Sequence, residues 1–497
     1  MSFLFLLNLS TCMMAFFCFR GVFRSSRIGL FCSSLYTLSI FRLFKSYSWS
    51  ALGETQAMLW LPLIFYAVYR LLADETDEEG YGTKWIPLAV GFSGIVQCHV
   101  LTCELTVFFL AFTCIVFWKR LLRRETFFAF VKGVLGTCVL SAWFVVPFLE
   151  YMLRVDMIIH HVSARTIQEI GLYPANLLLA FFHRGSSRDL ELNGMQEMEA
   201  LGVGITMTAA AGIMLLLWFW GFLREQKEDR ALVTAGKLAV SLGIAAMVMS
   251  LSIFPWNRIQ FLNSITEVLV SSIQYPNRFL MIATLLLCFV GGVVLLRVRS
   301  FFGRMAAKGV GVGFLAAAAV TSLFYISSIV TDAGALYMYD AKGIGTGYLS
   351  GGEYLRYGAD ASRYSYHGPL SGESVEVGDY RKEWLDIELS ARNDSDKESW
   401  IDLPLQNYRG YVVEADNGLK LEICDGENKD IRVLLPAGFE GEIQIRFQPP
   451  WYWRFAEAVS CLSVVSLIIR HFSGIKEKQL AEELNEKNSD YHRAGRK

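Results

Sequence analysis

A glutamate near the start of a long apolar run is the residue whose position in this sequence first indicates chemistry. Glu54 follows Gly53 within the stretch 51–70, ALGETQAMLWLPLIFYAVYR, which is long enough to cross a bilayer. Its carboxylate is either a solvated acid at a helix start or a group directed into a pocket at the membrane surface. In the second interpretation we expect Glu54 to be catalytic, as the base for a substrate hydroxyl or as a ligand of a cation beside a substrate phosphate.

Two further polar residues, His99 and Glu104, interrupt the apolar stretch 85–118. A histidine at such a place commonly marks a break between two helices and bonds to the backbone there. An acid so close to it in an otherwise apolar stretch favours a polar site instead. We include both residues in the predicted substrate-binding set and keep the helix-break interpretation of His99 open.

The segment Gln274–Arg278, QYPNR, stands immediately before another apolar run. Pro276 gives the chain a rigid approach to that run, and the Arg278 guanidinium can hold a lipid phosphate through two parallel hydrogen bonds. The alternative is that Arg278 extends to lipid headgroups in general. Gln274 and Arg278 complete the predicted substrate-binding residues.

The remaining polar residues of interest favour structural roles. Glu150 and Arg154 are one helical turn apart, which predicts a local ion pair. His160, His161 and His183 do not have the spacing of a metal-binding helix face. The sequence therefore predicts no metal site, and a divalent cation that accompanies the substrate is left open as a cofactor.

The composition indicates a membrane protein. Hydrophobic residues make up 53% of the 497 residues, charged residues only 19%, and the mean hydropathy is +0.36. The net charge of -1 and the lack of a long basic tract make nucleic acid an unexpected partner. Only Cys424 among the cysteines lies in a polar region, so no disulfide framework or zinc site is predicted.

Apolar runs of suitable length predict a polytopic α-helical protein with about eleven spans. They lie near 2–19, 28–45, 54–72, 85–99, 101–118, 127–148, 201–223, 231–253, 279–296, 309–330 and 454–471. The stretch 85–118 is too long for one helix, and His99 predicts the break between two short spans.

Three basic clusters, at 20–27, 119–124 and 297–308, predict the orientation. With an N-terminus outside, all three fall in cytoplasmic loops, as short loops rich in Lys and Arg should. The same topology puts the segments 46–53, 149–200, 254–278 and 331–453 outside the cytoplasm. All five candidate site residues then lie towards that outer side.

The segment 331–453 differs in kind from the rest. Apolar and polar residues alternate over 385–389 and 442–447, which predicts half-buried strands. Asp416-Asn417-Gly418 predicts a hairpin turn between two strands. We expect a transmembrane domain at 1–330, an extracytoplasmic β-sandwich at 331–453, a final transmembrane helix at 454–471 and a charged cytoplasmic tail at 472–497.

Several of these stretches, taken in order, resemble the bacterial YfhO-like membrane proteins, also described as 6-pyruvoyl-tetrahydropterin synthase-related. The stretch 33–70, SSLYTLSIFRLFKSYSWSALGETQAMLWLPLIFYAVYR, is similar to their segment in which basic residues and Gly-Glu precede a span with Leu-Pro-Leu. QYPNR is similar to their QFPWR, and 436–451, PAGFEGEIQIRFQPPW, to the end of their outer β-domain. Two departures are that QYPNR lacks the tryptophan and that Ser48-Trp49-Ser50 stands where a basic residue is expected before Gly-Glu.

The resemblance implies similarity to the GT-C class of glycosyltransferases, which use polyprenyl-phosphate sugars and have their catalytic site at the outer membrane face. It implies a bacterial cell membrane location, with membrane lipid, a polyprenyl-phosphate sugar donor and a cell-envelope glycan or lipid acceptor as partners. Family members also have an earlier span and an outer loop with a catalytic aspartate, which this sequence lacks, so a truncated or inactive relative is one expectation. The alternative function is a non-catalytic membrane protein for lipid-linked glycan handling or transport.

Overall fold

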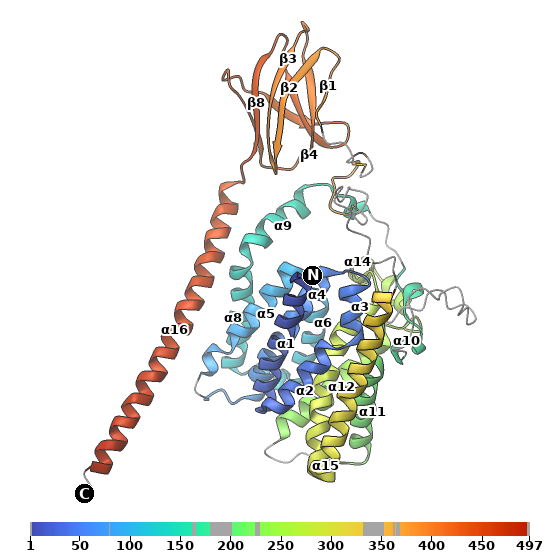
Figure 1. The fold of residues 1–497 in the computed structure, drawn as a ribbon, viewed down its shortest axis with the longest axis vertical. Coiled ribbons are helices and arrows are strands. Elements are labelled where there is room, and N and C mark those ends of the chain that lie inside the picture. Colours follow the sequence, from blue (N-terminus) through green and yellow to red (C-terminus); the bar gives the residue numbers. More distant parts are fainter. Residues whose placement is uncertain are drawn as a thin grey trace. The chain divides into compact units, whose positions relative to one another are not determined.

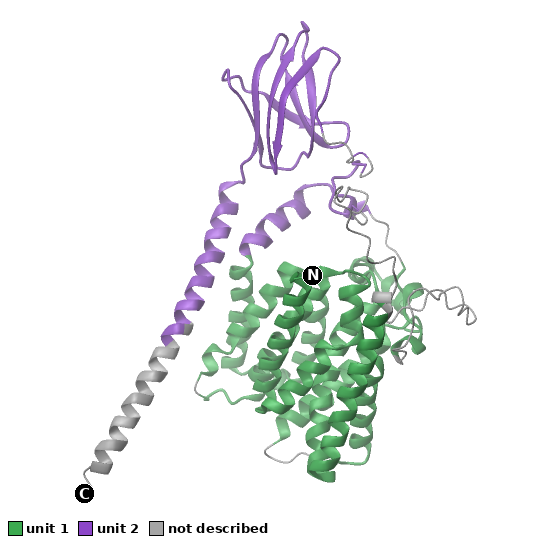
Figure 2. Cartoon of the chain, viewed as in Figure 1, with its two compact units in different colours: residues 1–141, 164–339 green, residues 142–163, 340–497 purple. Residues whose placement is uncertain are grey.

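The computed structural model describes residues 2–78, 80–161, 166–178, 201–223, 229–331, 352–360, 363 and 368–494. These residues divide into two compact units, which Figure 2 distinguishes by colour. Unit 1 comprises Met1–Ser141 and Ala164–Tyr339, and unit 2 comprises Ala142–Ser163 and Asp340–Lys497. Unit 1 is helical, and unit 2 combines the predicted β-region with two helices.

The first helices of unit 1 follow the predicted apolar runs. They are α1 (Ser2–Phe23), α2 (Ser26–Thr37), α3 (Ile40–Tyr47) and α4 (Leu52–Ala73). The predicted span 28–45 is broken, because α2 and α3 meet at an angle of 45°. Ser39 begins the second piece, where its side chain accepts a hydrogen bond from the Arg42 amide, as an N-cap serine does.

The predicted break at His99 is confirmed. Helix α5 (Trp85–Cys98) ends there, and α6 (Val100–Val116) begins after it, with His99 itself extended. Both helices have their other end near Asp74, because Lys84 bonds the Asp74 carboxylate and Arg120 donates to the Asp74 carbonyl. The chain therefore runs along α5 and returns along α6.

The rest of unit 1 consists of shorter helices and one long helical segment. In chain order they are η1 (Tyr81–Thr83), α7 (Trp118–Leu121), α8 (Arg124–Leu140), η3 (Gln168–Ile170), α10 (Pro174–Leu178), α11 (Gly204–Phe219), α12 (Arg230–Met249), α13 (Trp256–Gln260), α14 (Ser264–Ile273), η4 (Pro276–Arg278) and α15 (Phe279–Thr331). Figure 1 shows the longer ones arranged side by side as a bundle.

Helix α15 is two helices that meet at a kink. Gly303, with φ 87° and ψ 174°, is not helical, and such a conformation is readily adopted only by glycine. A Cβ atom added to Gly311 would lie 3.5 Å from the Leu295 side chain, so the two halves pack against each other. This agrees with the two predicted spans at 279–296 and 309–330.

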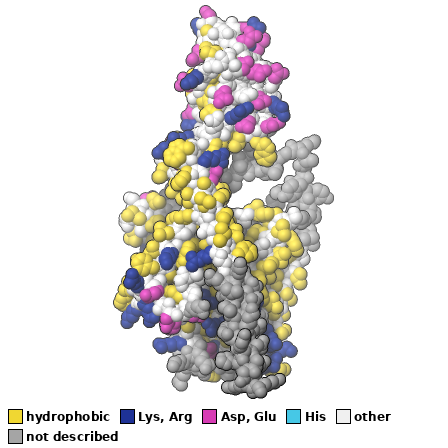
Figure 3. All heavy atoms as spheres, turned by 90° about the vertical axis from the view of Figure 1, so that its left-hand side faces the viewer, with side chains coloured by type: hydrophobic (Ala, Val, Ile, Leu, Met, Phe, Trp, Pro, Cys, Tyr) yellow, Lys and Arg dark blue, Asp and Glu magenta, His cyan; other side chains and the backbone are white. Residues whose placement is uncertain are grey.

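Among the described residues, five helices are long and apolar enough to cross a membrane, or up to seven if each bent pair forms one span. The second bent pair is α8 with α9 (Ala142–Arg154), which meet at 76°. The surface agrees with a lipid environment, since hydrophobic side chains cover the visible helices in Figure 3. Phe5, Ile115, Leu135 and Phe219 are among the exposed ones. The count of eleven spans stays a prediction.

The three basic clusters gather at one end of unit 1, the end where α4 finishes. Gly21, beside Arg20, packs against Tyr66 in the last third of α4. Arg120 bonds to Asp74, just after α4, and Arg297 lies 3.8 Å from Asp229, at the start of α12. Glu54 is at the opposite end of α4, about 24 Å from Arg70 at 1.5 Å per residue.

The β-region contains two antiparallel four-stranded sheets, in the orders β1-β4-β7-β6 and β2-β3-β8-β5. The strands are β1 (Leu370–Ser371), β2 (Val375–Glu383), β3 (Asp386–Asn393), β4 (Ser399–Gln406), β5 (Tyr411–Ala415), β6 (Glu422–Asp425), β7 (Asp430–Leu435) and β8 (Glu440–Phe447). Ile387 and Ile443 of one sheet share a buried core with Ile401 and Val433 of the other. The sheets therefore pack face to face, and the predicted alternation over β3 and β8 is confirmed.

The predicted hairpin at Asp416-Asn417-Gly418 is wrong. A turn does form there, with Gly418 at φ 74° donating to the Ala415 carbonyl. However, β5 before it pairs with β8, whereas β6 after it pairs with β7 in the other sheet. The turn therefore connects the two sheets. β5 pairs with β8 and β6 pairs with β7, and each of these partners is longer than β5 or β6.

Unit 2 also contains η2 (Ile158–His161), α9 and the long C-terminal helix α16 (Trp451–Ala494). The predicted Glu150–Arg154 pair is present at 3.4 Å, but Glu150 does much more. Its carboxylate accepts hydrogen bonds of 2.7 Å each from Tyr452, Trp453 and Arg409. Glu150 thus joins α9, the β-region and the start of α16.

Candidate functional site

Glu54 lies buried between two cations. Its Oε2 is 2.8 Å from the Lys45 ammonium, and its Oε1 accepts a hydrogen bond of 2.8 Å from Nε of Arg278. The three side chains are only 0–8% exposed. We refer to Lys45, Glu54 and Arg278 as the charge cluster.

The local sequence explains how Lys45 and Glu54 meet. Lys45 is in the last turn of α3, and Glu54 is in the first turn of α4. The chain reverses between them, with Ser50 at φ 50° and the Ala51 amide donating to the Lys45 carbonyl. Gly53 lets the turn approach α5, because a Cβ atom there would lie 2.9 Å from the Cys98 carbonyl oxygen.

Arg278 reaches the charge cluster from the segment QYPNR. Helix α14 ends at Ile273. The next residue, Gln274, turns the chain with a φ of 60°, and Pro276 begins the short helix η4. Nη1 of Arg278 then donates to the Ile273 carbonyl at 2.8 Å and to Oε1 of Gln274 at 2.9 Å. These bonds fix the guanidinium, and Gln274, which is exposed, connects the cluster to the surface.

Aromatic rings lie beside both cations. The Lys45 ammonium is 4.0 Å from the centre of the Trp49 ring, and the Arg278 guanidinium is 5.4 Å from that of Tyr275. Trp49 and Tyr275 contact each other edge to face, with centres 5.3 Å apart. The negative faces of such rings stabilise cations that have lost water.

His99 caps a helix and borders the charge cluster. Its Nδ1 accepts a hydrogen bond from the Thr102 amide at 3.2 Å, which caps α6. Its ring would lie 3.5 Å from a Cβ atom on Gly53, and it interacts electrostatically with the cluster. The helix-break interpretation therefore holds, and it does not remove His99 from the site.

Glu104 faces the same segment as Arg278. Its two oxygens accept hydrogen bonds from the Ser272 hydroxyl at 2.8 and 3.0 Å. Ser272 precedes Gln274 by two positions, so all five predicted residues meet around one stretch of chain. Among the described residues no cation pairs with Glu104, in contrast to Glu54.

The charge cluster carries net positive charge. Lys45 and Arg278 each contribute one positive charge and Glu54 one negative charge, so these three side chains by themselves sum to +1. A buried charge that is not balanced costs free energy, and an anion beside it recovers that cost. Both Glu54 oxygens are engaged by cations, so in this arrangement neither is directed at a substrate hydroxyl.

Sequence reasoning missed Lys45. It lies at the end of the predicted span 28–45, where a lysine usually extends to the membrane surface. The structure shows that the Lys45 ammonium is instead buried against Oε2 of Glu54. A lysine and a glutamate on either side of a short polar turn were the sequence signal that could have predicted this contact.

One helical turn before Lys45, another buried cation, Arg42, donates hydrogen bonds to neutral groups through Nη1 and Nη2, while its Nε has no partner among the described residues. Arg42 is fully buried and donates to Asn8 at 2.6 Å and to Thr11 at 3.2 Å. It also donates to the Thr37 carbonyl. Its role is to join α1 to α3 beneath the charge cluster.

The remaining histidines singled out in the sequence lie outside the described part of unit 1. His161, in unit 2, bonds Asp156 at 2.6 Å and stacks on Tyr357, and His183 lies outside the described residues. Within the described ranges, no three His, Cys, Asp or Glu side chains are arranged to hold a metal ion.

No protein-family model, curated protein or solved structure matches this chain. The functional argument therefore rests on the charge cluster and on the residues around it.

Proposed function

We propose that this chain is a multi-pass bacterial membrane protein of GT-C-like architecture. It binds a polyprenyl-phosphate sugar and transfers the sugar to an extracytoplasmic glycan or lipid acceptor. The observation that carries the proposal is the buried charge cluster with its net charge of +1. A phosphate monoanion or dianion has the charge that this cluster lacks, and Arg and Lys are the side chains that bind it.

The position of the cluster supports an outer site. It lies at the end of α4 opposite the three basic clusters, which by the positive-inside rule face the cytoplasm. In this topology the chain crosses the membrane about eleven times, and the β-region is outside the cytoplasm. A polyprenyl chain would lie along the apolar helices while its phosphate reaches the bundle end.

In the proposed reaction an acceptor hydroxyl oxygen attacks the anomeric carbon of the donor sugar. The bond from that carbon to the phosphate oxygen breaks, and its electron pair leaves on polyprenyl phosphate. Lys45 and Arg278 stabilise the charge that develops on this leaving group. The hydroxyl proton passes to a carboxylate base.

The geometry favours Glu104 over Glu54 as that base. Glu104 accepts hydrogen bonds only from Ser272 among the described residues, so its carboxylate can turn to a substrate hydroxyl. Glu54 then acts as a positioning residue that holds the two cations at a fixed separation. Gln274 and His99 border the place where the sugar and its phosphate would lie.

A transfer assay on the protein in membranes tests these roles. We expect Glu104→Gln to lower kcat by about 10²–10⁴-fold, the range for loss of a general base. Lys45→Met should both raise KM for the donor and lower kcat, because Lys45 binds the donor phosphate and stabilises the charge that develops on it. Glu267→Gln, on α14 but outside the site, is the matched control and should change neither constant. Equal rates for Glu104→Gln and the control would exclude the assigned base.

The second candidate is non-catalytic handling of lipid-linked glycans. It is favoured by the engagement of both Glu54 oxygens with cations, which suits tight binding more than proton transfer. In that case the donor binds to the wild-type protein, Lys45→Met weakens this binding, and no sugar leaves the donor at any acceptor concentration.

A further inference from the structure

A cavity of about 630 Å³ lies at the other end of unit 1, within the bundle. It is bounded by α4, α6, α12 and α15, all of which belong to that unit. Its volume is in the range of pockets that bind small ligands. Because Glu54 is at the opposite end of α4, this cavity is separate from the charge cluster.

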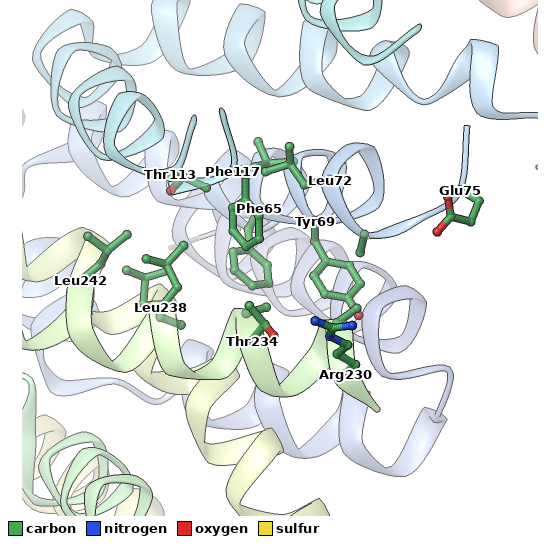
Figure 4. A pocket seen from close by; sticks show the side chains of 16 residues that line it. Phe65, Tyr69, Leu72, Glu75, Thr113, Phe117, Arg230, Thr234, Leu238 and Leu242 are labelled. Atoms are coloured by element: carbon green, nitrogen blue, oxygen red, sulfur yellow. The ribbon is translucent and has the colours of Figure 1, made fainter. Parts of the chain in front are cut away.

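One face of α12 supplies both polar and apolar side chains to the lining of the cavity. Arg230, Thr234, Leu238 and Leu242 follow one another at intervals of four, which places them on one side of the helix. The first two are polar and the last two apolar. Figure 4 shows Arg230 and Thr234 near the Tyr69 hydroxyl, and the leucines further along.

The cavity therefore has a cationic end and an apolar length. The α12 stripe from Arg230 to Leu242 is about 18 Å long at 1.5 Å per residue. A bilayer hydrocarbon core is about 30 Å thick, so the stripe has the depth of roughly one leaflet. Phe65 and Leu72 of α4 line the opposite side.

The surrounding charges suit an anionic headgroup. Glu75 also lines the cavity, but it is already paired with Arg120 at 3.4 Å and Arg123 at 3.5 Å. Arg297 is 2% exposed, and its Nη2 has no hydrogen-bond partner among the described residues. Its Nη1 is 3.8 Å from Asp229, the residue before Arg230. The described acids at the polar end, Glu75 and Asp229, thus have arginine partners.

We infer that this cavity binds one acyl chain of an anionic phospholipid, whose phosphate is held by Arg230 with the hydroxyls of Tyr69 and Thr234. The arginine and the two hydroxyls are the donors that a phosphate accepts from. The chain lies along Leu238 and Leu242. Membrane leaflets rich in anionic lipid attract such basic ends of membrane proteins.

The test compares phosphatidylglycerol with phosphatidylcholine of the same acyl chains, by native mass spectrometry of the purified full chain in neutral detergent. We expect phosphatidylglycerol to bind about tenfold more tightly, and Arg230→Gln to remove that difference. Ala235→Phe, which fills the cavity, should weaken both lipids. The matched control is Arg299→Gln, an exposed basic residue at the same end that does not line the cavity.

Equal binding of the two lipids to the wild-type protein would overturn the inference. So would an Arg230→Gln protein that behaves like Arg299→Gln. If Ala235→Phe does not fold, the Arg230→Gln comparison still decides the outcome, because this residue is in the first turn of α12. The result is independent of the proposed donor site, which none of these substitutions touches.

Discussion

At the scale of single residues, removing Glu54 from the charge cluster has a different consequence from removing Lys45. Glu54 is the only acid between two cations, and all three side chains are buried. Removing Glu54 takes away the acid that Lys45 and Arg278 share, whereas removing Lys45 leaves Glu54 paired with Arg278. We therefore expect the loss of Glu54 to affect folding more, and the loss of Lys45 to affect the proposed binding more.

We predict that Glu54→Gln lowers the free energy of unfolding by about 3–5 kcal/mol, the usual cost of breaking a buried ion pair. Lys45→Met should cost clearly less, because Arg278 still neutralises Glu54. Thermal unfolding of both proteins in the same detergent measures the difference. Equal unfolding midpoints would show that Glu54 is not needed to neutralise Lys45 and Arg278 in the folded protein.

The sequence located the site but not its electrostatics. Glu54, Gln274 and Arg278 could be singled out because each stands at the start of an apolar run, where a polar residue is conspicuous. Their direct contacts could not be predicted, since Glu54 and Arg278 are 224 residues apart. Lys45 was hidden because a lysine at a span end has an ordinary explanation.

At the scale of elements, Glu150 stabilises the junction of three of them in unit 2. It accepts from Arg409 of the β-region and from Tyr452 and Trp453 at the start of α16. We predict that Glu150→Ala destabilises this junction by about 1–3 kcal/mol, because the buried Trp453 indole and the half-buried Tyr452 hydroxyl lose their acceptor. Faster amide hydrogen exchange at 451–456 would report it.

The matched control for that change is Glu457→Gln, since Glu457 is also on α16 but bonds only Arg454 in its own helix. This variant should leave exchange at 451–456 unchanged. If Glu150→Ala also exchanges at the wild-type rate, Glu150 is a local partner of Arg154 and nothing more.

A second pairing of elements depends on pH. Arg356 holds both carboxylate oxygens of Asp425 on β6. Partial burial alone would raise the pKa of Asp425, but hydrogen bonds from Arg356 and Asn407 lower it below the ordinary value of 3.8. A lowered folded-state pKa means that the pair stabilises the fold above the unfolded pKa and loses this effect as pH falls through the folded one.

We therefore predict that Arg356→Gln destabilises the β-region by about 1 kcal/mol at pH 7, as expected of a partly exposed pair. The difference from wild type should shrink below about pH 4. Asp430, whose pKa is raised by burial and by Asp402, has the opposite pH dependence, but it is common to both proteins and cancels. Hydrogen exchange of β6 against pH measures the difference, and a constant difference down to pH 3 would contradict the assignment.

Elements were predictable where the signal is local. The break at His99 and the strands β3 and β8 follow from length limits and from period-two alternation. The hairpin at 416–418 failed because turn residues specify a reversal of the chain but not the sheet that the next strand joins. The bend between α2 and α3 was missed because Ser39 is a weak signal within an apolar run.

At the scale of the whole molecule, the proposed topology assigns sides of the membrane to segments far apart in the sequence. Ser50 is at the charge-cluster end of unit 1, and Ser300 is at the basic end, three residues before the kink at Gly303. We predict that cysteines at Ser50 and at Asp396 of the β-region react with a membrane-impermeant maleimide in intact cells. A cysteine at Ser300 should react only after permeabilisation.

These substitutions belong in a background without the native cysteines that react, such as the exposed Cys138 and Cys461. Labelling of Ser300→Cys in intact cells would contradict the proposed orientation. It would show that the charge cluster is on the cytoplasmic side.

The most direct measurement of the central claim is the affinity of the purified full chain for polyprenyl phosphate, compared with the uncharged polyprenol of equal length. We predict that the phosphate binds at least about tenfold more tightly, through charge-assisted hydrogen bonds to the charge cluster. Lys45→Met should abolish this preference, and Arg299→Gln, an exposed basic residue outside both the charge cluster and the cavity, should keep it. Equal affinities for the two lipids, or a preference that survives Lys45→Met, would contradict the account.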